Sequence, residues 1–103
     1  MNNRETKQIT LNKSGLVVTY KAFINAQERR DWLRVAMNES DSKVNSRFEL
    51  EDFVFNLLTV SIGQDKEGFV PIIMNLHQDD YKQIDKAYSE VILGEDFLEK
   101  KEN

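Results

Sequence analysis

The chain contains no cysteine and only one histidine, His77, among its 103 residues. Without cysteine there is no disulfide, no thiol nucleophile and no thiolate metal ligand, and one imidazole leaves no pair for zinc. No apolar run approaches the roughly 20 residues that a membrane-spanning helix needs. Neither the start, MNNRETKQ, nor the end, GEDFLEKKEN, is typical of a signal peptide or membrane anchor. We therefore expect a cytosolic protein without a metal, cofactor or membrane partner.

Glycine and basic charge are also scarce. The four glycines are scattered singly, so neither GxGxxG nor GxxxxGK[ST] occurs and no phosphate-binding loop is expected. The chain has 18 acidic against 14 basic residues, a balance that disfavours phosphate-backbone binding. Arg29, Arg30 and Arg34 surround Trp32, but acidic residues share the same turns, so a solvated helix face with intrahelical pairing is favoured over a nucleic-acid surface.

Carboxylates gather at two places, Glu49 to Asp52 and Asp79 with Asp80. The acids near His77 suggest a base with an orienting carboxylate, but no nucleophile elbow or oxyanion motif surrounds a loop serine such as Ser14 or Ser46. We interpret both clusters as helix N-terminal charge on a solvated face, and His77 as a residue at a helix start. No catalytic residue is predicted, and the chain is expected not to be an enzyme.

Apolar residues make up 40% of the chain and aromatic residues 10%, enough for one small core. We expect a single domain over residues 1–103, with frayed tails at 1–5 and 95–103. Residues 6–11 alternate at strand period, a turn with Gly15 follows, and 16–23 are rich in β-branched and aromatic residues. This pattern predicts a β-hairpin.

The pattern after residue 23 predicts helices. Asn25 and Glu28 form a capping-box pattern for a first helix, which ends in a solvated loop at 38–46. Ser46 and Glu49 form a second capping box, before a helix that runs to about 61–63 and anchors the core through a stripe comprising Leu50, Phe53, Val54, Leu57 and Leu58. A short helix is favoured near 69–76, and a third main helix follows Asp80 and stops at Gly94. The predicted fold class is α+β, a hairpin packed on three main helices and one short helix.

A few residues stand apart from this core pattern. Phe55 points away from the stripe of its helix, Val44 lies in a polar loop, and Phe97 and Leu98 lie in a charged tail. Satellite core contacts and a partner-binding role are about equally favoured for them. The candidate partner-binding residues, which also include two arginines of the first helix, are Arg30, Arg34, Val44, Phe55, Phe97 and Leu98.

Taken in order, these segments resemble a known family. The hairpin with Lys13-Ser-Gly-Leu-Val-Val-Thr-Tyr20 is followed by a helix opening with Gln27-Glu-Arg29. The second helix ends in Val60-Ser-Ile-Gly63. Next come Gly68-Phe-Val70, Ile73-Met-Asn-Leu76, and Asp79-Asp-Tyr81 with Ile84. Over residues 6 to about 92 this pattern is similar to the tail assembly chaperones of long-tailed bacteriophages. It departs from the family where His77 and Gln78 replace a frequent proline.

The resemblance implies a non-enzymatic role in tail morphogenesis. Family members act in the cytoplasm of the infected bacterium and are absent from the finished virion. They coat the tape measure protein, help recruit tail-tube subunits, and often have a longer form made by ribosomal frameshifting. A small acidic domain with spare apolar residues suits reversible, multivalent coating of a filament, and self-association is compatible with it.

Two other classes stay open. One is a structural virion component, such as a tail-terminator or head–tail connector subunit that forms a ring. The other is a small acidic inhibitor of a host enzyme, which is less favoured because the acids are interleaved with lysine and arginine.

Overall fold

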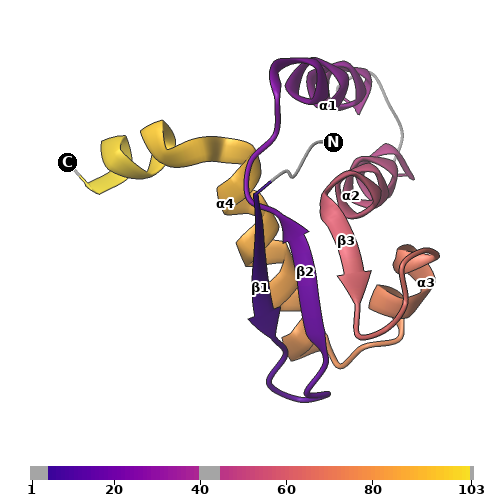
Figure 1. The fold of residues 1–103 in the computed structure, drawn as a ribbon. Coiled ribbons are helices and arrows are strands. Elements are labelled where there is room, and N and C mark those ends of the chain that lie inside the picture. Colours follow the sequence, from indigo (N-terminus) through magenta and orange to yellow (C-terminus); the bar gives the residue numbers. More distant parts are fainter. Residues whose placement is uncertain (1–4, 40–44, 103) are drawn as a thin grey trace.

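The computed structural model describes residues 5–39 and 45–102, and the side chains of 5–37 and 48–94. Two strands come first, β1 (Thr6–Thr10) and β2 (Val17–Lys21), followed by α1 (Ala26–Glu39) and α2 (Asn45–Leu58). The chain continues through β3 (Thr59–Ile62), α3 (Phe69–Met74) and α4 (Gln78–Glu102). Figure 1 shows the helices on one side and at one edge of a three-stranded sheet. The α+β class, with an N-terminal hairpin and one short helix, is confirmed.

The predicted hairpin forms with an antiparallel register in which Ile9 pairs with Val18. Its turn is closed by hydrogen bonds from Leu11 N–H to the Leu16 carbonyl and from Gly15 N–H to the Leu11 carbonyl, at 2.8 and 2.9 Å. Gly15 adopts φ 78°, a left-handed conformation that a side chain disfavours. Alternation then places Val18 and Tyr20 on the buried face of β2.

A third strand replaces the predicted end of the second helix. We expected the helix to continue to residues 61–63, but α2 ends at Leu58 and Thr59–Ile62 pairs antiparallel with β2. The segment is Thr-Val-Ser-Ile, whose β-branched residues favour a strand. Its pairing partner, Val18 opposite Ile62, lies far away in the sequence. The order β1-β2-β3 therefore makes β2 the central strand.

The start of α1 confirms the predicted capping box. The Glu28 N–H donates to Asn25 Oδ1 at 2.8 Å, and the Asn25 N–H donates to Glu28 Oε1 at 3.0 Å. Each side chain thus satisfies a backbone donor that the first turn leaves unpaired. The second predicted box begins at Ser46, whose side chain lies outside the described part. The helix itself does begin there, at Asn45.

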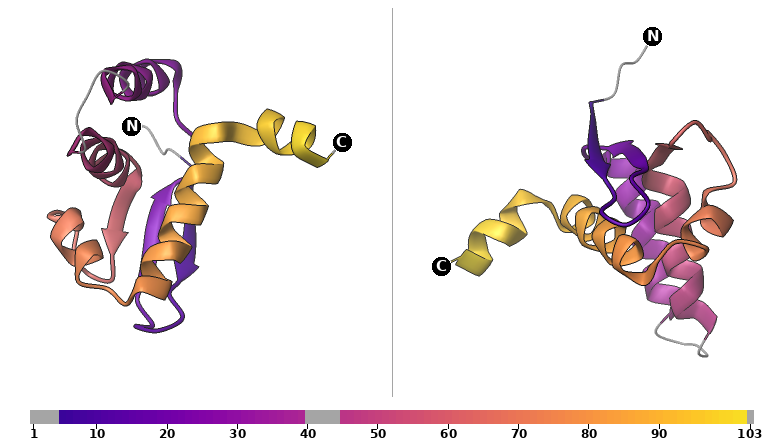
Figure 2. Two further views of the ribbon diagram at one scale, coloured as in Figure 1. Left: turned by 180° about the vertical axis from the view of Figure 1, so that it is seen from behind. Right: turned by 90° about the horizontal axis from the view of Figure 1, so that it is seen from below.

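Helix α4 crosses one face of the sheet (Figure 2), and the core lies between them and α2. Tyr88 is its centre, with its ring centroid 5.1 Å from Tyr20 and 6.1 Å from Phe55. The fully buried apolar side chains come from every layer: Leu11, Val18, Phe55, Leu58, Ile62, Ile73, Ile84 and Tyr88.

Phe55 corrects the predicted orientation of the second helix. Its side chain is 1% exposed, so it is a central core residue and does not point outward. Leu58 is one turn further along the same side and is also buried. Most of the predicted stripe, Leu50, Val54 and Leu57, is only half-buried because it lies on another side of α2. The helix has apolar residues on two sides, so counting them did not reveal which side packs against α4.

Asp80 is a buried anchor for the hairpin turn. Its two carboxylate oxygens accept the N–H groups of Lys13 and Ser14 at 2.8 and 2.9 Å, and the residue is 0% exposed. The expectation of a solvated face was therefore wrong for Asp80, although it does lie in the first turn of α4. A carboxylate that accepts two backbone donors is stable in its charged form even when covered.

Gly94 interrupts α4, which confirms the prediction that the third main helix stops there. It has φ 80° and ψ 171°, outside the helical region, and the chain turns helical again to Glu102. We call residues 95–102 the C-terminal arm. Figures 1 and 2 show it directed away from the sheet and from α2. The fraying expected for this tail stays a prediction, and the first four residues of the other tail lie outside the described part.

Candidate functional site: an apolar groove between α2 and α4

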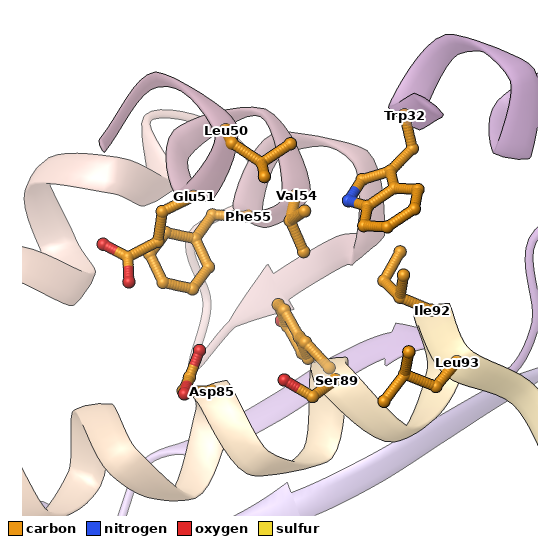
Figure 3. Close-up of a pocket in the computed structure, with 10 residues that line it drawn as sticks. Trp32, Leu50, Glu51, Val54, Phe55, Asp85, Ser89, Ile92 and Leu93 are labelled. Atoms are coloured by element: carbon orange, nitrogen blue, oxygen red, sulfur yellow. The ribbon is translucent and has the colours of Figure 1, made fainter. Parts of the chain in front are cut away.

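A groove of about 300 Å³ lies between α2 and α4. Its walls are mostly apolar and come from both helices, and Trp32 of α1 stands over one end (Figure 3). We call it the α2–α4 groove and define it by its apolar residues Trp32, Leu50, Val54, Phe55, Tyr88, Ile92 and Leu93, with Glu51, Asp85 and Ser89 as its polar ones.

The floor of the groove is part of the core and is held in place by it. Phe55 and Tyr88 are each 1% exposed, and their rings meet edge to face. The Tyr88 hydroxyl and the Thr59 hydroxyl share a buried hydrogen bond of 2.7 Å. Burial raises the pKa of Tyr88 to about 12, although the bond to Thr59 opposes this. The floor is therefore a preformed surface and not a loose gap.

The rim is partly exposed at the end where α4 breaks. Leu93 is 45% exposed there, directly before Gly94. Trp32 and Leu50 are partly buried and face the same space (Figure 3). A large apolar side chain left half in water at the edge of an apolar hollow is typical of an interaction surface.

The opposite end of the groove is acidic. Glu51 of α2 and Asp85 of α4 both line it and lie at the same end in Figure 3. Glu51 accepts a hydrogen bond from the Tyr81 hydroxyl, which ties the two helices together. Among the residues with described side chains, no lysine or arginine forms an ion pair with either carboxylate. The groove is thus apolar at one end and negatively charged at the other.

The candidate residues predicted from sequence fall in different places. Phe55 lines the groove, but as its buried floor. Arg30 and Arg34 are exposed on α1, where Arg34 pairs with Asp31 at 3.1 Å, so the expected intrahelical pairing is found there. Val44 lies outside the described residues. Phe97 and Leu98 belong to the C-terminal arm, and their side chains lie outside the described part.

Sequence reasoning missed the groove residues on α4 and the role of Trp32. Ile92 and Trp32 are apolar residues of helices, and nothing in the local sequence distinguishes a residue of a core face from one of a groove wall. Leu93 was the one available signal, because it follows Ile92 directly and so extends beyond the stripe of its helix.

His77 lies beside Asp79, with its Nδ1 3.8 Å from Asp79 Oδ2. It precedes α4, and its Nδ1 accepts the N–H of Asp79 at 3.0 Å, so it caps the helix start. Asp80, the other acid, is turned to the hairpin. Within the described residues no group of three or more histidine and acidic side chains is arranged to hold a metal ion.

Comparisons of the chain with protein-family models, with curated proteins and with solved structures found no match. Across residues 5–39 and 45–102, no helix has the length and apolar character needed to cross a membrane.

Proposed function

We propose that the chain is a non-enzymatic tail assembly chaperone of a long-tailed bacteriophage, and that the α2–α4 groove binds an amphipathic helical segment of the tape measure protein. The single observation that carries the proposal is the groove itself, an apolar hollow of about 300 Å³ with Leu93 45% exposed at its rim. The family resemblance of the sequence supplies the identity of the partner.

The dimensions and shape of the groove suit a helix. Its α4 wall runs from Asp85 to Leu93, a rise of roughly 12 Å or about two helical turns. A partner helix with apolar residues at positions i, i+3 or i+4 and i+7 presents one such stripe. Contacts of this size are individually weak, and many copies along a filament give firm coating through multivalency.

The charge at the acidic end of the groove defines the partner further. Glu51 and Asp85 favour a lysine or arginine next to the apolar stripe of the bound segment, and disfavour an acid there. The chain's net charge of −4 would keep the covered filament soluble while the tail-tube subunits are recruited. In this proposal the protein acts in the cytoplasm of the infected host and leaves the particle before the virion is complete.

Co-expression with a tape measure fragment tests the proposal. The wild-type chain should raise the soluble yield of the fragment severalfold, and Leu93→Lys should abolish most of that gain because it places a charge at the apolar rim. Met74→Lys is the matched control, since Met74 is 51% exposed on α3 and does not line the groove. Equal loss in both variants, or no gain with the wild-type chain, would contradict the proposal.

Mass spectrometry of purified virions separates the proposal from a structural role. A chaperone is absent from the finished particle, whereas a tail-terminator or connector subunit stays in it. Detection of the chain at a stoichiometric level in virions would exclude the chaperone function.

A further inference from the structure

The C-terminal arm begins where the groove ends. Leu93 is the last groove residue on α4, Gly94 breaks the helix, and residues 95–102 form a new helical segment. Figures 1 and 2 show this arm projecting from the body and directed away from α2, which forms the other wall of the groove. A helical segment that projects from the body beyond a glycine break is an arrangement that permits exchange between copies.

The sequence of the arm is divided into two sides. At 100° per residue, Phe97, Leu98, Lys100 and Lys101 share one side, and Glu95, Asp96, Glu99 and Glu102 share the opposite side. The first of these two sides is therefore apolar at its N-terminal half and basic at its C-terminal half. An amphipathic segment of this kind is stabilised when its apolar side is covered.

The groove complements this order of properties. It is apolar from Trp32 to Leu93 and acidic at Glu51 and Asp85. A helix of about eight residues, which rises roughly 12 Å, matches the length of the α4 wall. With the arm antiparallel to α4, its apolar pair meets the apolar end and its lysine pair meets the two carboxylates.

We propose that the C-terminal arm of one copy occupies the α2–α4 groove of a second copy. The contact covers the apolar groove while no client is bound, and a client helix must displace the arm. This inference names an alternative occupant of the site in the proposed function. Its regulatory consequence, competition between the arm and the client, rests on that proposed function. Reciprocal exchange between two copies gives a closed dimer, and one-way exchange gives a chain of copies.

Sedimentation velocity of the full-length chain at low ionic strength, where surface charges are least screened, tests the contact. The wild-type chain should associate in a concentration-dependent manner. The paired change Lys100→Glu with Lys101→Glu should raise the dissociation constant at least tenfold, and Asp85→Lys should do the same. Combining the changes in one chain should bring the dissociation constant part of the way back toward the wild-type value, because the pairing with position 85 is restored with the signs reversed while Glu51 keeps its charge.

Matched controls lie on the other sides of the same elements. Glu90 is exposed on α4 but lines a separate hollow with Tyr20 and Phe23, so Glu90→Lys should change the dissociation constant less than twofold. Glu99→Lys with Glu102→Lys alters the acidic side of the arm and should likewise have little effect. Trp32 fluorescence gives a second readout. Dilution of the wild-type chain should separate the copies and expose the groove, which should shift the Trp32 emission to the red.

The inference is overturned if the wild-type chain stays monomeric at all concentrations, which includes the case in which the arm folds onto its own groove. It is also overturned if the charge-exchanged chain associates no better than the single sets. Client solubility, measured with the same variants, separates the two proposals. If the chain associates through the arm but does not bind the client, only the proposed chaperone function is contradicted. If a monomeric chain binds the client, only the proposed arm contact is contradicted.

Discussion

At the scale of single residues, we expect the stability of the fold to depend most on the buried polar side chains. Asp80 joins the hairpin turn to α4 through two backbone hydrogen bonds, and Tyr88 joins α4 to β3 through Thr59. Because a buried polar atom costs free energy when its partner is removed, these positions are more sensitive than the exposed acids around them.

Asp80→Asn tests the first of these joints. Burial alone would raise the pKa of Asp80, but the N–H and hydroxyl hydrogen bonds from Lys13 and Ser14 outweigh it and lower the pKa below 3.8. A lowered folded-state pKa adds stability above the unfolded-state pKa, which is lost as pH falls through the folded value. Asp80→Asn should therefore lower the melting temperature at pH 7 and weaken its fall below about pH 4.

Asp79→Asn is the control for this measurement, because Asp79 is half exposed beside His77. Thermal unfolding followed by circular dichroism at several pH values should show a small effect for it at every pH. Equal melting temperatures for Asp80→Asn and the wild-type chain at pH 7 would contradict the anchoring role.

Tyr88→Phe tests the second joint. It leaves the Thr59 hydroxyl buried without this partner and should cost about 1–3 kcal/mol of unfolding free energy, as should Thr59→Val. The double variant should cost less than the sum of the two, since it leaves neither hydroxyl unsatisfied. Urea denaturation measures all three, and strict additivity would argue against the bond.

The raised pKa of Tyr88 also predicts how the unfolding free energy changes at alkaline pH. Its pKa is raised from 10.0 to about 12 by burial, so the stability it adds is complete below pH 10 and is lost as pH rises from 10 toward 12. Tyr88→Phe should flatten the fall in unfolding free energy over this window, measured by denaturation at stepwise pH.

At the scale of elements, local signals account for most of what sequence predicts well. The Asn25–Glu28 box, the Gly15 turn and the Gly94 break each depend on neighbours within a few residues. Such features can be recognised before any tertiary structure is known, because their hydrogen bonds and backbone angles are set locally.

Asn25→Ala tests the importance of the α1 cap. Removing the Asn25 side chain leaves a first-turn N–H without its acceptor, and we expect a loss of about 1 kcal/mol in unfolding free energy. Gln27→Ala, at an exposed position in the same turn, should change it by less than about 0.5 kcal/mol. The urea midpoints of the two variants should differ accordingly, and equal midpoints would mean that the cap contributes nothing.

Elements that depend on distant partners were predicted less well. Thr59–Ile62 becomes a strand because β2 offers an unpaired edge, and only the folded chain brings Val18 beside Ile62. Phe55 is buried because α2 turns that side toward Tyr88. The groove escaped prediction for the same reason, since its walls are two helices separated by β3 and α3.

At the scale of the whole molecule, the core and the groove share their residues. Phe55 and Tyr88 are at once the centre of the core and the floor of the groove. The floor of the proposed binding surface is therefore formed by the same side chains that form the core. A preformed floor reduces the ordering cost of binding and suits rapid, reversible contact with many similar segments.

Trp32 gives the most direct test of the central claim, because it is the only tryptophan of the chain and stands over the groove. Its fluorescence should shift to the blue and saturate when a tape measure fragment is titrated into the wild-type chain. Met74→Lys should retain the shift and Leu93→Lys should lose it. If the fragment co-sediments with the chain while Trp32 emission stays constant, the client binds elsewhere and the groove is not its site.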